Sequence, residues 1–353
     1  LDRWKRAERT KKHEADLRVD PKVLKWIRKT KRFFLNGIEA KFDDALIRKS
    51  LYRPFTTQFY YMDRMFNEDL YAIPTIVPSE SVAGRNRILI TTTSSQIPFL
   101  AQMCNFVPCH DAGDRPSQSF PFYVYEDDKR QENITDWTLT EFRANYDDPS
   151  ITKWDIFHYV YAILHHSVYR ARYEANLKKE LPRIPFAPDF RGFVEAGARL
   201  VELHVDYQKQ REWRLTRLET PGEPLNWRVE KMKLTRDKTG IIYNSFLTLS
   251  GMPPEAFEYR LGNRSAIDWI IDQYQVSIDP RSGITNDPNR LDDEEYIVRL
   301  IGQVITVSVE TVKIVRAMPP LDRDAKRDGI APKSPDDGGA GRPKRPRRSK
   351  SGG

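Results

Sequence analysis

Two polar stretches of the sequence carry side chains of the types that read the edges of DNA bases. The first covers residues 79–96, where arginine, asparagine and glutamine stand among serines and threonines. Arginine pairs with guanine and asparagine or glutamine with adenine, whereas hydroxyl groups and lysine hold phosphates. We therefore predict that this stretch contacts bases and phosphates, with Arg85, Asn86, Arg87 and Gln96 on bases and Thr92 and Ser94 on phosphates.

The second stretch, residues 228–239, combines basic side chains with the pattern of a hairpin. Residues 227–232 alternate as a strand does, and a turn at 237–240 precedes a second strand at 241–243. A two-stranded ribbon fits the major groove. An ordinary solvated loop is the more common explanation of either stretch taken alone. As DNA contacts we predict Arg228, Lys231, Lys233 and Arg236 for bases and Lys238 for phosphate.

The common catalytic and nucleotide-binding motifs are absent from the sequence. It has no Gly-rich phosphate loop, no dinucleotide fingerprint and no G-x-S-x-G nucleophile elbow. It also lacks the Asn-Pro-Pro-Tyr type of tetrapeptide that is typical of amino-methylating DNA methyltransferases. His158 and His165 lie seven residues apart without a carboxylate or cysteine at ligand spacing, and Cys104, Cys109 and His110 are too few for zinc. We predict no catalytic residue, metal site or cofactor in this chain.

Composition and charge favour a soluble protein with basic ends. Hydrophobic residues make up 39% of the chain, mean hydropathy is −0.65, and no apolar run is long enough for a bilayer. Two cysteines predict a reducing compartment, the cytoplasm. Residues 1–50 hold 16 Lys and Arg against 8 Asp and Glu, residues 321–353 hold 10 against 5, and the remainder holds 32 against 37. The chain begins with Leu, which predicts a longer parent protein.

The periodicity of apolar residues predicts an α+β fold with mixed β-sheets and packed helices. Aromatic and β-branched runs predict strands at 59–61, 88–93 and 120–125, with a long loop between 94 and 119. Apolar residues at three- and four-residue steps predict helices within 150–209, at 265–275 and at 294–315. The predicted organisation begins with a basic helical linker (1–50). A domain at 51–250 follows, with a β-rich lobe (51–149), a helical insert (150–209) and a β-hairpin lobe (210–250). A C-terminal helical subdomain (251–320) and a disordered basic tail (321–353) complete the chain.

Several segments resemble, in order, the C-terminal specificity region of the type ISP restriction–modification enzymes, single-chain relatives of type I systems. Together they cover roughly residues 50–318. The segments are YRPF at 52–55, FYY at 59–61, WDIFHYVYAILH at 154–165, LPRIPF at 181–186, YRLGNRSAIDW at 259–269, DQYQ at 272–275 and SGITNDPN at 282–289.

The resemblance implies that this chain is one part of a longer protein whose domains have different functions. In that family a nuclease, a helicase-like ATPase and an adenine methyltransferase precede the specificity region. It implies that this chain recognises double-stranded DNA, with residues 51–250 as the DNA target-recognition domain and residues 1–50 as the linker from an upstream methyltransferase domain. S-adenosylmethionine, ATP and Mg are then expected in the upstream domains, and no membrane partner is expected.

Base-reading residues should differ between enzymes with different targets, so the resembling segments are interpreted mainly as scaffold. Arg53, Arg264 and Arg281, within or beside those segments, are predicted to hold phosphates or to form structural ion pairs. Two other functions stay open at this point. One is a nucleic-acid-processing enzyme with an unfamiliar site, and the other is a protein-interaction module that uses the helices within 150–209 and 294–315.

Overall fold

The computed structural model describes residues 27–322 except 83, 93, 95, 127, 128, 281 and 282. Residues 1–26 of the predicted linker and 323–353 of the predicted tail lie outside the described residues, as does Arg281. The described ranges mix helices with small sheets, which confirms the α+β prediction. The predicted domain boundaries stay predictions.

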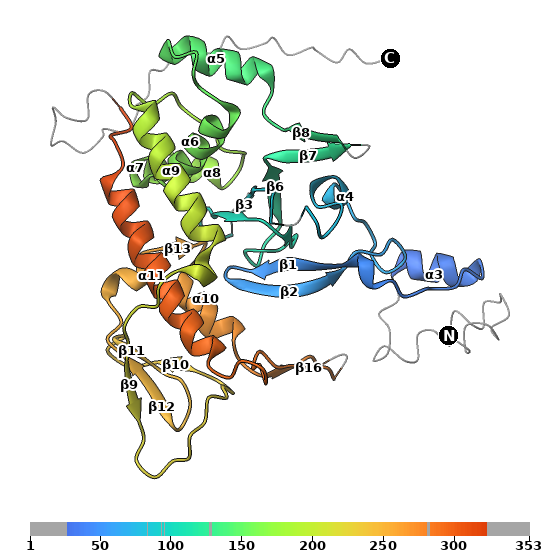
Figure 1. The fold of residues 1–353 in the computed structure, drawn as a ribbon, viewed down its shortest axis with the longest axis vertical. Helices are drawn as coiled ribbons and strands as arrows, with labels where there is room; N and C mark the ends of the chain where they lie inside the picture. The colour runs from blue at the N-terminus through green and yellow to red at the C-terminus, as the bar shows by residue number, and fades with distance from the viewer. Residues whose placement is uncertain are drawn as a thin grey trace, which may run out of the picture.

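Three long helices form one side of the molecule, with α9 and α11 side by side along its length (Figure 1). A capping box between Thr152 and Asp155 starts the first of them, and Asp189 caps the second through the Gly192 N–H. The first two helices approach closely, since a Cβ atom added at Gly197 would lie 1.9 Å from the His158 carbonyl oxygen. The three are α6 (Lys153–His165), α9 (Phe190–Val205) and α11 (Tyr296–Ala317).

The other described helices are short. Thr135 caps α5 by accepting the Thr138 N–H, and this helix was not predicted from the apolar periodicity. The bounds are α3 (Arg28–Leu35), α4 (Ile73–Ile76), α5 (Asp136–Tyr146), α7 (Ser167–Arg172), α8 (Glu174–Leu177) and α10 (Ala266–Gln273), with 3-10 helices η1 (Asp44–Leu46), η2 (Tyr207–Lys209) and η3 (Pro254–Phe257).

The upper half of the molecule in Figure 1 contains a three-stranded sheet and a separate two-stranded ribbon. The central strand of the three-stranded sheet, residues 88–92, is buried at all five positions, which explains its continuous apolar and β-branched sequence. The sheet order is β4 (Ala101–Cys104), β3 (Ile88–Thr92), β6 (Ser117–Pro121), and the ribbon pairs β7 (Tyr123–Glu126) with β8 (Lys129–Glu132).

A hairpin crosses the middle of the molecule and ends in its core. Its turn residue Phe55 adopts a positive φ of 58° and is 1% exposed. The Phe55 carbonyl accepts the hydroxyl hydrogens of Tyr207 and Tyr274, at 3.4 and 3.1 Å, so segments 152 and 219 residues further along the chain meet at this turn. The hairpin strands are β1 (Ile47–Arg53) and β2 (Thr56–Tyr61), and β5 (Val107–Pro108) pairs with β1 in parallel.

The lower half carries a four-stranded antiparallel sheet and two small hairpins. The sheet order is β10 (Lys233–Leu234), β11 (Gly240–Ile242), β12 (Leu247–Ser250), β9 (Thr216–Glu219). The hairpins are β13 (Arg260–Leu261) with β14 (Arg264–Ser265), and β15 (Ser277–Ile278) with β16 (Thr285–Asn286).

The structure confirms the predicted long helices and most predicted strands, and corrects two predictions. The stretch 94–119 is not one long loop, because it contains β4 and β5, both buried. Residues 227–232 form no strand, although they are held in a fixed place by amide side chains. Asn244 donates to the Arg228 carbonyl, while Asn289 accepts from the Val229 N–H and donates to its carbonyl. Among the described helices, none has both the length and the apolar character to cross a bilayer.

Candidate nucleic-acid interface

Asn86 is fully buried and links two elements of the upper half. Its Nδ2 donates to the carbonyl oxygens of Ile76 and Tyr123, at 3.1 and 2.8 Å. Its Oδ1 accepts the N–H groups of Tyr123 and Arg87, each at 2.9 Å. Both N–H donors and both acceptor positions of its carboxamide are therefore used inside the protein. Asn86 therefore holds the start of β7 against α4, which corrects the prediction that it reads a base.

Thr92 also has an internal role. It is 0% exposed at the end of β3, and its hydroxyl accepts the Leu100 N–H at 3.1 Å. As placed, it cannot reach a phosphate, so this prediction is corrected as well.

Arg87 is half-buried, and its Nη1 donates to the carbonyl oxygens of Gly84 and Asn86, at 2.8 and 3.0 Å. These two bonds fix the loop that leads into β3.

The remaining candidates of residues 79–96 lie at opposite ends of β3. Arg85 is exposed before the strand, next to Gly84, which faces Asn105. Gln96 is exposed after the strand, and its N–H donates to the half-buried Ser94 hydroxyl at 3.1 Å. The structure therefore divides the first predicted cluster into two separate places.

The basic residues of the second cluster surround the β10–β11 hairpin. Lys231, Lys233, Arg236 and Lys238 are all exposed. Asp237 fixes the turn by accepting the hydroxyls of Thr235 and Thr239, at 2.6 and 2.8 Å. The next residue, Lys238, has a φ of 58°. The structure thus contains a hairpin at the predicted turn, but its first strand is Lys233–Leu234 and not the predicted residues 227–232.

Arg228 differs from the other members of this cluster because it has two acidic partners. Its Nε lies 2.8 Å from Glu230 Oε1, and its Nη2 lies 2.8 Å from Asp287 Oδ2. Asp287 and Asn289 belong to the SGITNDPN segment, so that segment holds residues 228 and 229 in place. A contact of Arg228 with a base would compete with these ion pairs.

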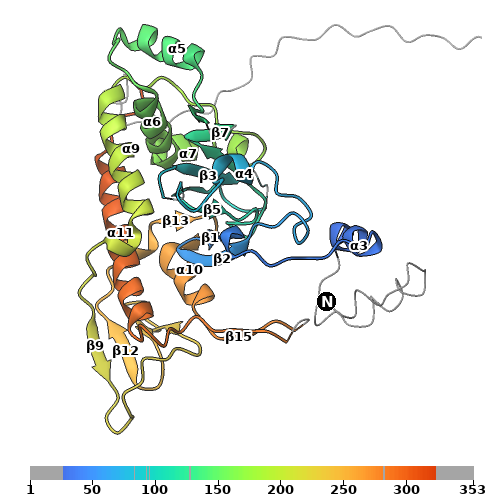
Figure 2. The same ribbon diagram turned by 45° about the vertical axis from the view of Figure 1, so that its right-hand side comes forward.

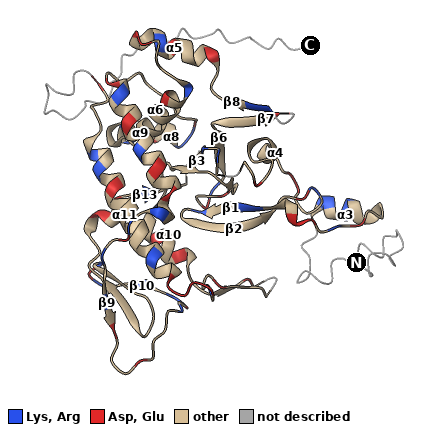
Figure 3. Ribbon diagram, in the orientation of Figure 1, with Lys and Arg blue, Asp and Glu red and all other residues tan. Residues whose placement is uncertain are grey.

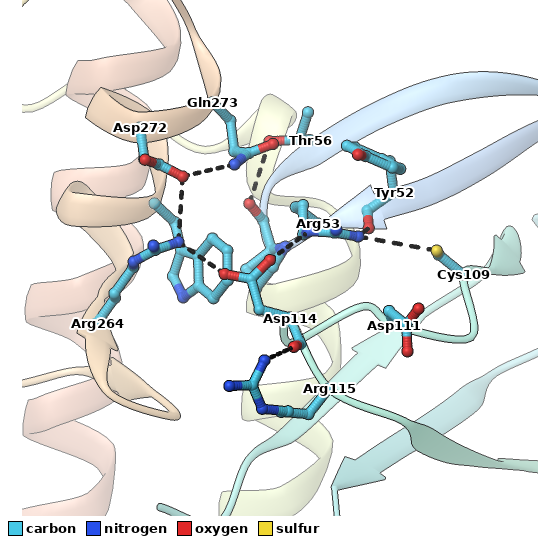
Figure 4. Close-up of polar contacts among 12 residues, drawn as sticks. Tyr52, Arg53, Thr56, Cys109, Asp111, Asp114, Arg115, Arg264, Asp272 and Gln273 are labelled. Atoms are coloured by element: carbon cyan, nitrogen blue, oxygen red, sulfur yellow. Dashed lines mark hydrogen bonds and ion pairs between the residues drawn. The ribbon is translucent and has the colours of Figure 1, made fainter. Parts of the chain in front are cut away.

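Arg53 and Arg264 share the carboxylate of Asp114 (Figure 4). Arg53 Nε donates to Asp114 Oδ1 at 2.8 Å, and Arg264 Nη1 donates to Asp114 Oδ2 at 2.9 Å. Arg264 Nη1 also donates to Asp272 Oδ2 at 3.1 Å. Of the two roles predicted for these arginines, the geometry supports structural ion pairs. The network joins the β1–β2 hairpin to β14 and the end of α10.

The two predicted clusters do not form one continuous surface. The β10–β11 hairpin belongs to the sheet at the lower end of the molecule, whereas β3 and α4 lie in its upper half in both views (Figures 1 and 2). Nor do the charges form a single basic stripe, since Lys and Arg alternate with Asp and Glu along the long helices (Figure 3). The density of basic residues therefore does not locate a DNA-binding surface among the described residues.

Three hairpins project from the side of the molecule that faces away from α9 and α11. They are β1–β2, which continues toward α3, the β7–β8 ribbon above it and the β15–β16 hairpin below it (Figure 1). All four residues of β8 are exposed, as are both residues of β15 and of β16. Projecting two-stranded elements of this kind can enter a DNA groove.

A polar groove with a volume of about 480 Å³ lies between β1–β2 and β15–β16. The sequence analysis did not select its residues, because its four carboxamides come from three separate elements and three of them lie in segments interpreted as scaffold. The signal that could have found them is the density of glutamine in the DQYQ segment. The groove is lined by Tyr52, Gln58, Asp272, Gln273, Gln275, Ser277, Ile278, Asp279, Ile284 and Asn286.

His165 and His204 are buried core residues, whereas His158 is half-buried. His204 lies between the Tyr161 hydroxyl, 2.6 Å from Nδ1, and the Thr311 hydroxyl, 2.8 Å from Nε2. Burial lowers the pKa of His204 to about 3 and the pKa of His165 well below its usual value. Within the described ranges, no three His, Cys, Asp or Glu side chains are arranged to hold a metal ion.

A family model described as the Type ISP C-terminal specificity domain matches residues 2–300. The chain is also similar to a solved structure of the ATP-dependent Type ISP restriction-modification enzyme LlaBIII bound to DNA. The identity is 27% and the TM-score is 0.81, over 91% of this chain and 21% of that chain. No curated protein matches the chain.

Two further solved structures are similar. One is a nuclease-deletion mutant of the Type ISP restriction-modification enzyme LlaGI in complex with a DNA substrate mimic, with 32% identity and a TM-score of 0.74 over 85% of this chain and 27% of that chain. The other is a DrdV–DNA complex, with 32% identity and a TM-score of 0.81 over 90% of this chain and 32% of that chain. This chain thus spans between about a fifth and a third of the length of the three proteins.

Proposed function

The chain belongs to the Type ISP C-terminal specificity domain family, and from this premise we propose that it recognises a target sequence in double-stranded DNA for a larger restriction–modification enzyme. The observation that carries the proposal is the family match over residues 2–300. The three similar structures described above are complexes with DNA or a DNA mimic, which supports the same function.

We propose that the reactions of this enzyme take place outside the chain. Adenine methylation with S-adenosylmethionine, and cleavage that needs ATP and Mg, would be performed by upstream domains, and the adjoining methyltransferase domain is the expected protein partner. A base that is to be methylated must leave the duplex stack. The specificity domain would hold the duplex so that the target adenine faces that methyltransferase domain. We place the enzyme in the cytoplasm, where two free cysteines are stable.

We propose that the duplex lies against the side from which the three hairpins project. Exposed residues that suit DNA are present there on β8, which carries Lys129, Arg130 and Gln131. DNA contact also stays a proposal for the members of the two predicted clusters that keep a surface position. These are Arg85, Arg87, Ser94, Gln96, Arg228, Lys231, Lys233, Arg236 and Lys238.

The experiment that tests this function exchanges the chain between enzymes. The enzyme that contains this chain is produced in cells without other DNA methyltransferases, and methylated bases are mapped across the genome. We expect one defined motif with a methylated adenine. Replacement of this chain by the specificity domain of a family member with a different motif should replace the motif. The proposal fails if the motif stays the same after the exchange, or if methylation follows no motif.

A further inference from the structure

Carboxamide side chains gather in the groove between the β1–β2 and β15–β16 hairpins. Gln58 is exposed on β2, Gln273 and Gln275 lie at the end of α10, and Asn286 is exposed on β16. A carboxamide presents one donor and one acceptor side by side, the pattern that recognises base edges. The groove therefore has the chemistry of a base contact, at a place where two projecting hairpins meet the body of the protein.

The charge of the groove is unsuited to a phosphate. Asp272 and Asp279 line it, and its described lining residues include no lysine or arginine. Phosphate binding depends on positive side chains or on several N–H donors. The Asp272 carboxylate already accepts from Arg264 and from Gln273, at 3.1 and 2.7 Å. A ligand that brings negative charge would meet this carboxylate.

Internal hydrogen bonds fix which groups the two glutamines of α10 can offer. Gln273 Nε2 donates to the Asp272 carboxylate at 2.7 Å, and Gln275 Nε2 donates to the Asp272 carbonyl oxygen at 2.8 Å. Each Nε2 thus uses one of its two N–H groups inside the protein, and each side chain keeps its oxygen as an acceptor. Acceptors pair with exocyclic amines, which adenine carries at N6 and cytosine at N4 in the major groove.

We propose that this groove is a specificity-determining site that contacts one base of the target and selects adenine or cytosine by its exocyclic amine. The inference rests on the proposed function. It assigns a base contact to Gln273, Gln275 and Asn286, although they lie in segments interpreted mainly as scaffold, whereas Gln58 lies outside those segments and can differ with the target. The other occupant considered is a loop of the neighbouring methyltransferase domain. Only Ile278 and Ile284 among the ten lining residues are aliphatic, and the central part of a protein–protein interface is more apolar than that. The composition of the groove favours the base.

The test uses the enzyme that contains this chain with Gln58→Ala and Asn286→Ala, singly and together. Both residues are exposed on hairpin strands, so the fold is expected to tolerate the changes. Asn145→Ala is the matched control, since it removes an exposed carboxamide from α5. Genome-wide mapping of methylated adenines then gives the motif of each variant. Loss of a bidentate contact should lower discrimination at one motif position by about 5- to 150-fold, with the other positions unchanged.

The outcomes separate this inference from the proposed function. Relaxation of one position in the groove variants, with the control keeping the wild-type motif, supports the base contact. An unchanged motif overturns it, whether total methylation falls, as loss of domain docking would cause, or stays at the wild-type level. If the wild-type enzyme itself follows no motif, the proposed function fails instead.

Discussion

At Asn86 one carboxamide makes four hydrogen bonds inside the protein and none of its bonding atoms is left for a ligand. The residue type was suited to an adenine contact, so the sequence analysis selected it. Whether a polar residue faces solvent depends on partners 10 and 37 positions away, Ile76 and Tyr123. Such partners are not visible in a local pattern, which is why residue types alone misassigned Asn86 and Thr92.

Asn86→Ala should therefore destabilise the fold rather than relax a DNA specificity. The change leaves the Tyr123 N–H and carbonyl without their partner, and a buried group without a partner costs about 1–3 kcal/mol. Urea unfolding of the 353-residue chain measures the loss. Arg85→Ala, an exposed change one position away, is the control and should stay within about 0.5 kcal/mol of wild type. Equal stabilities would contradict the structural role.

Arg85 itself is expected to matter for DNA. If it reads a guanine, Arg85→Ala should cost about 1–3 kcal/mol of binding free energy on the target duplex and less on random DNA. Fluorescence anisotropy with the two duplexes, at one fixed salt concentration, gives both values. Equal losses on the two duplexes would make Arg85 a phosphate contact, and no loss on either would remove it from the interface.

At the scale of secondary-structure elements, the predictions were correct where the apolar periodicity or the capping residues of a segment determine its structure. Helices α6, α9, α10 and α11 follow from apolar periodicity, and α6 and α10 also have capping boxes. The prediction failed for residues 227–232, whose alternation resembles a strand. The carbonyls of residues 227–229 accept from the side chains of Tyr243, Asn244 and Asn289, and the Glu230 carbonyl accepts the Val276 N–H. The groove was missed for a related reason, because it exists only where three distant elements meet.

The packing of α6, α9 and α11 around His204 makes the stability of the fold depend on pH. An unfolded histidine titrates near pH 6.5, whereas the folded pKa of His204 is about 3. Between these values the unfolded chain binds a proton that the folded chain excludes. The free energy of unfolding should therefore be highest above pH 6.5 and should fall on acidification toward pH 3, by up to about 1.4 kcal/mol per pH unit for each such histidine.

Denaturant unfolding at several pH values measures this slope. His204→Gln keeps an acceptor and a donor for Tyr161 and Thr311 and should reduce the slope by about one proton. Asn145→Gln, an exposed change on α5 that involves no titratable group, serves as the control and should keep the wild-type slope. Wild-type behaviour of His204→Gln across this range would show that another group causes the acid sensitivity.

At the scale of the whole molecule, the positive charge is concentrated at the two ends of the chain, whereas residues 51–320 carry a net negative charge. Residues 51–320 hold 32 Lys and Arg against 37 Asp and Glu, and the described surface shows both signs interspersed (Figure 3). Long-range attraction to the phosphates must then come from the two ends of the chain. We therefore expect residues 51–320 to supply base selectivity through a small number of side chains. The two basic ends of the chain would supply affinity that does not depend on the DNA sequence.

The C-terminal end offers a direct test, because residues 342–350 contain six Lys and Arg and no acidic residue. Replacement of these six by serine keeps the chain length and should weaken binding equally on target and random duplexes. If all six contact phosphates, the slope of log K against log salt should become shallower by about 5, since each released counterion contributes about 0.9. The slope is measured by anisotropy titrations at several salt concentrations. A control with six serines, glycines or prolines of residues 329–353 changed to alanine should keep the wild-type slope. An unchanged slope in the basic variant would mean that affinity does not come from this end, and the basic residues at the start of the chain would then have to supply it.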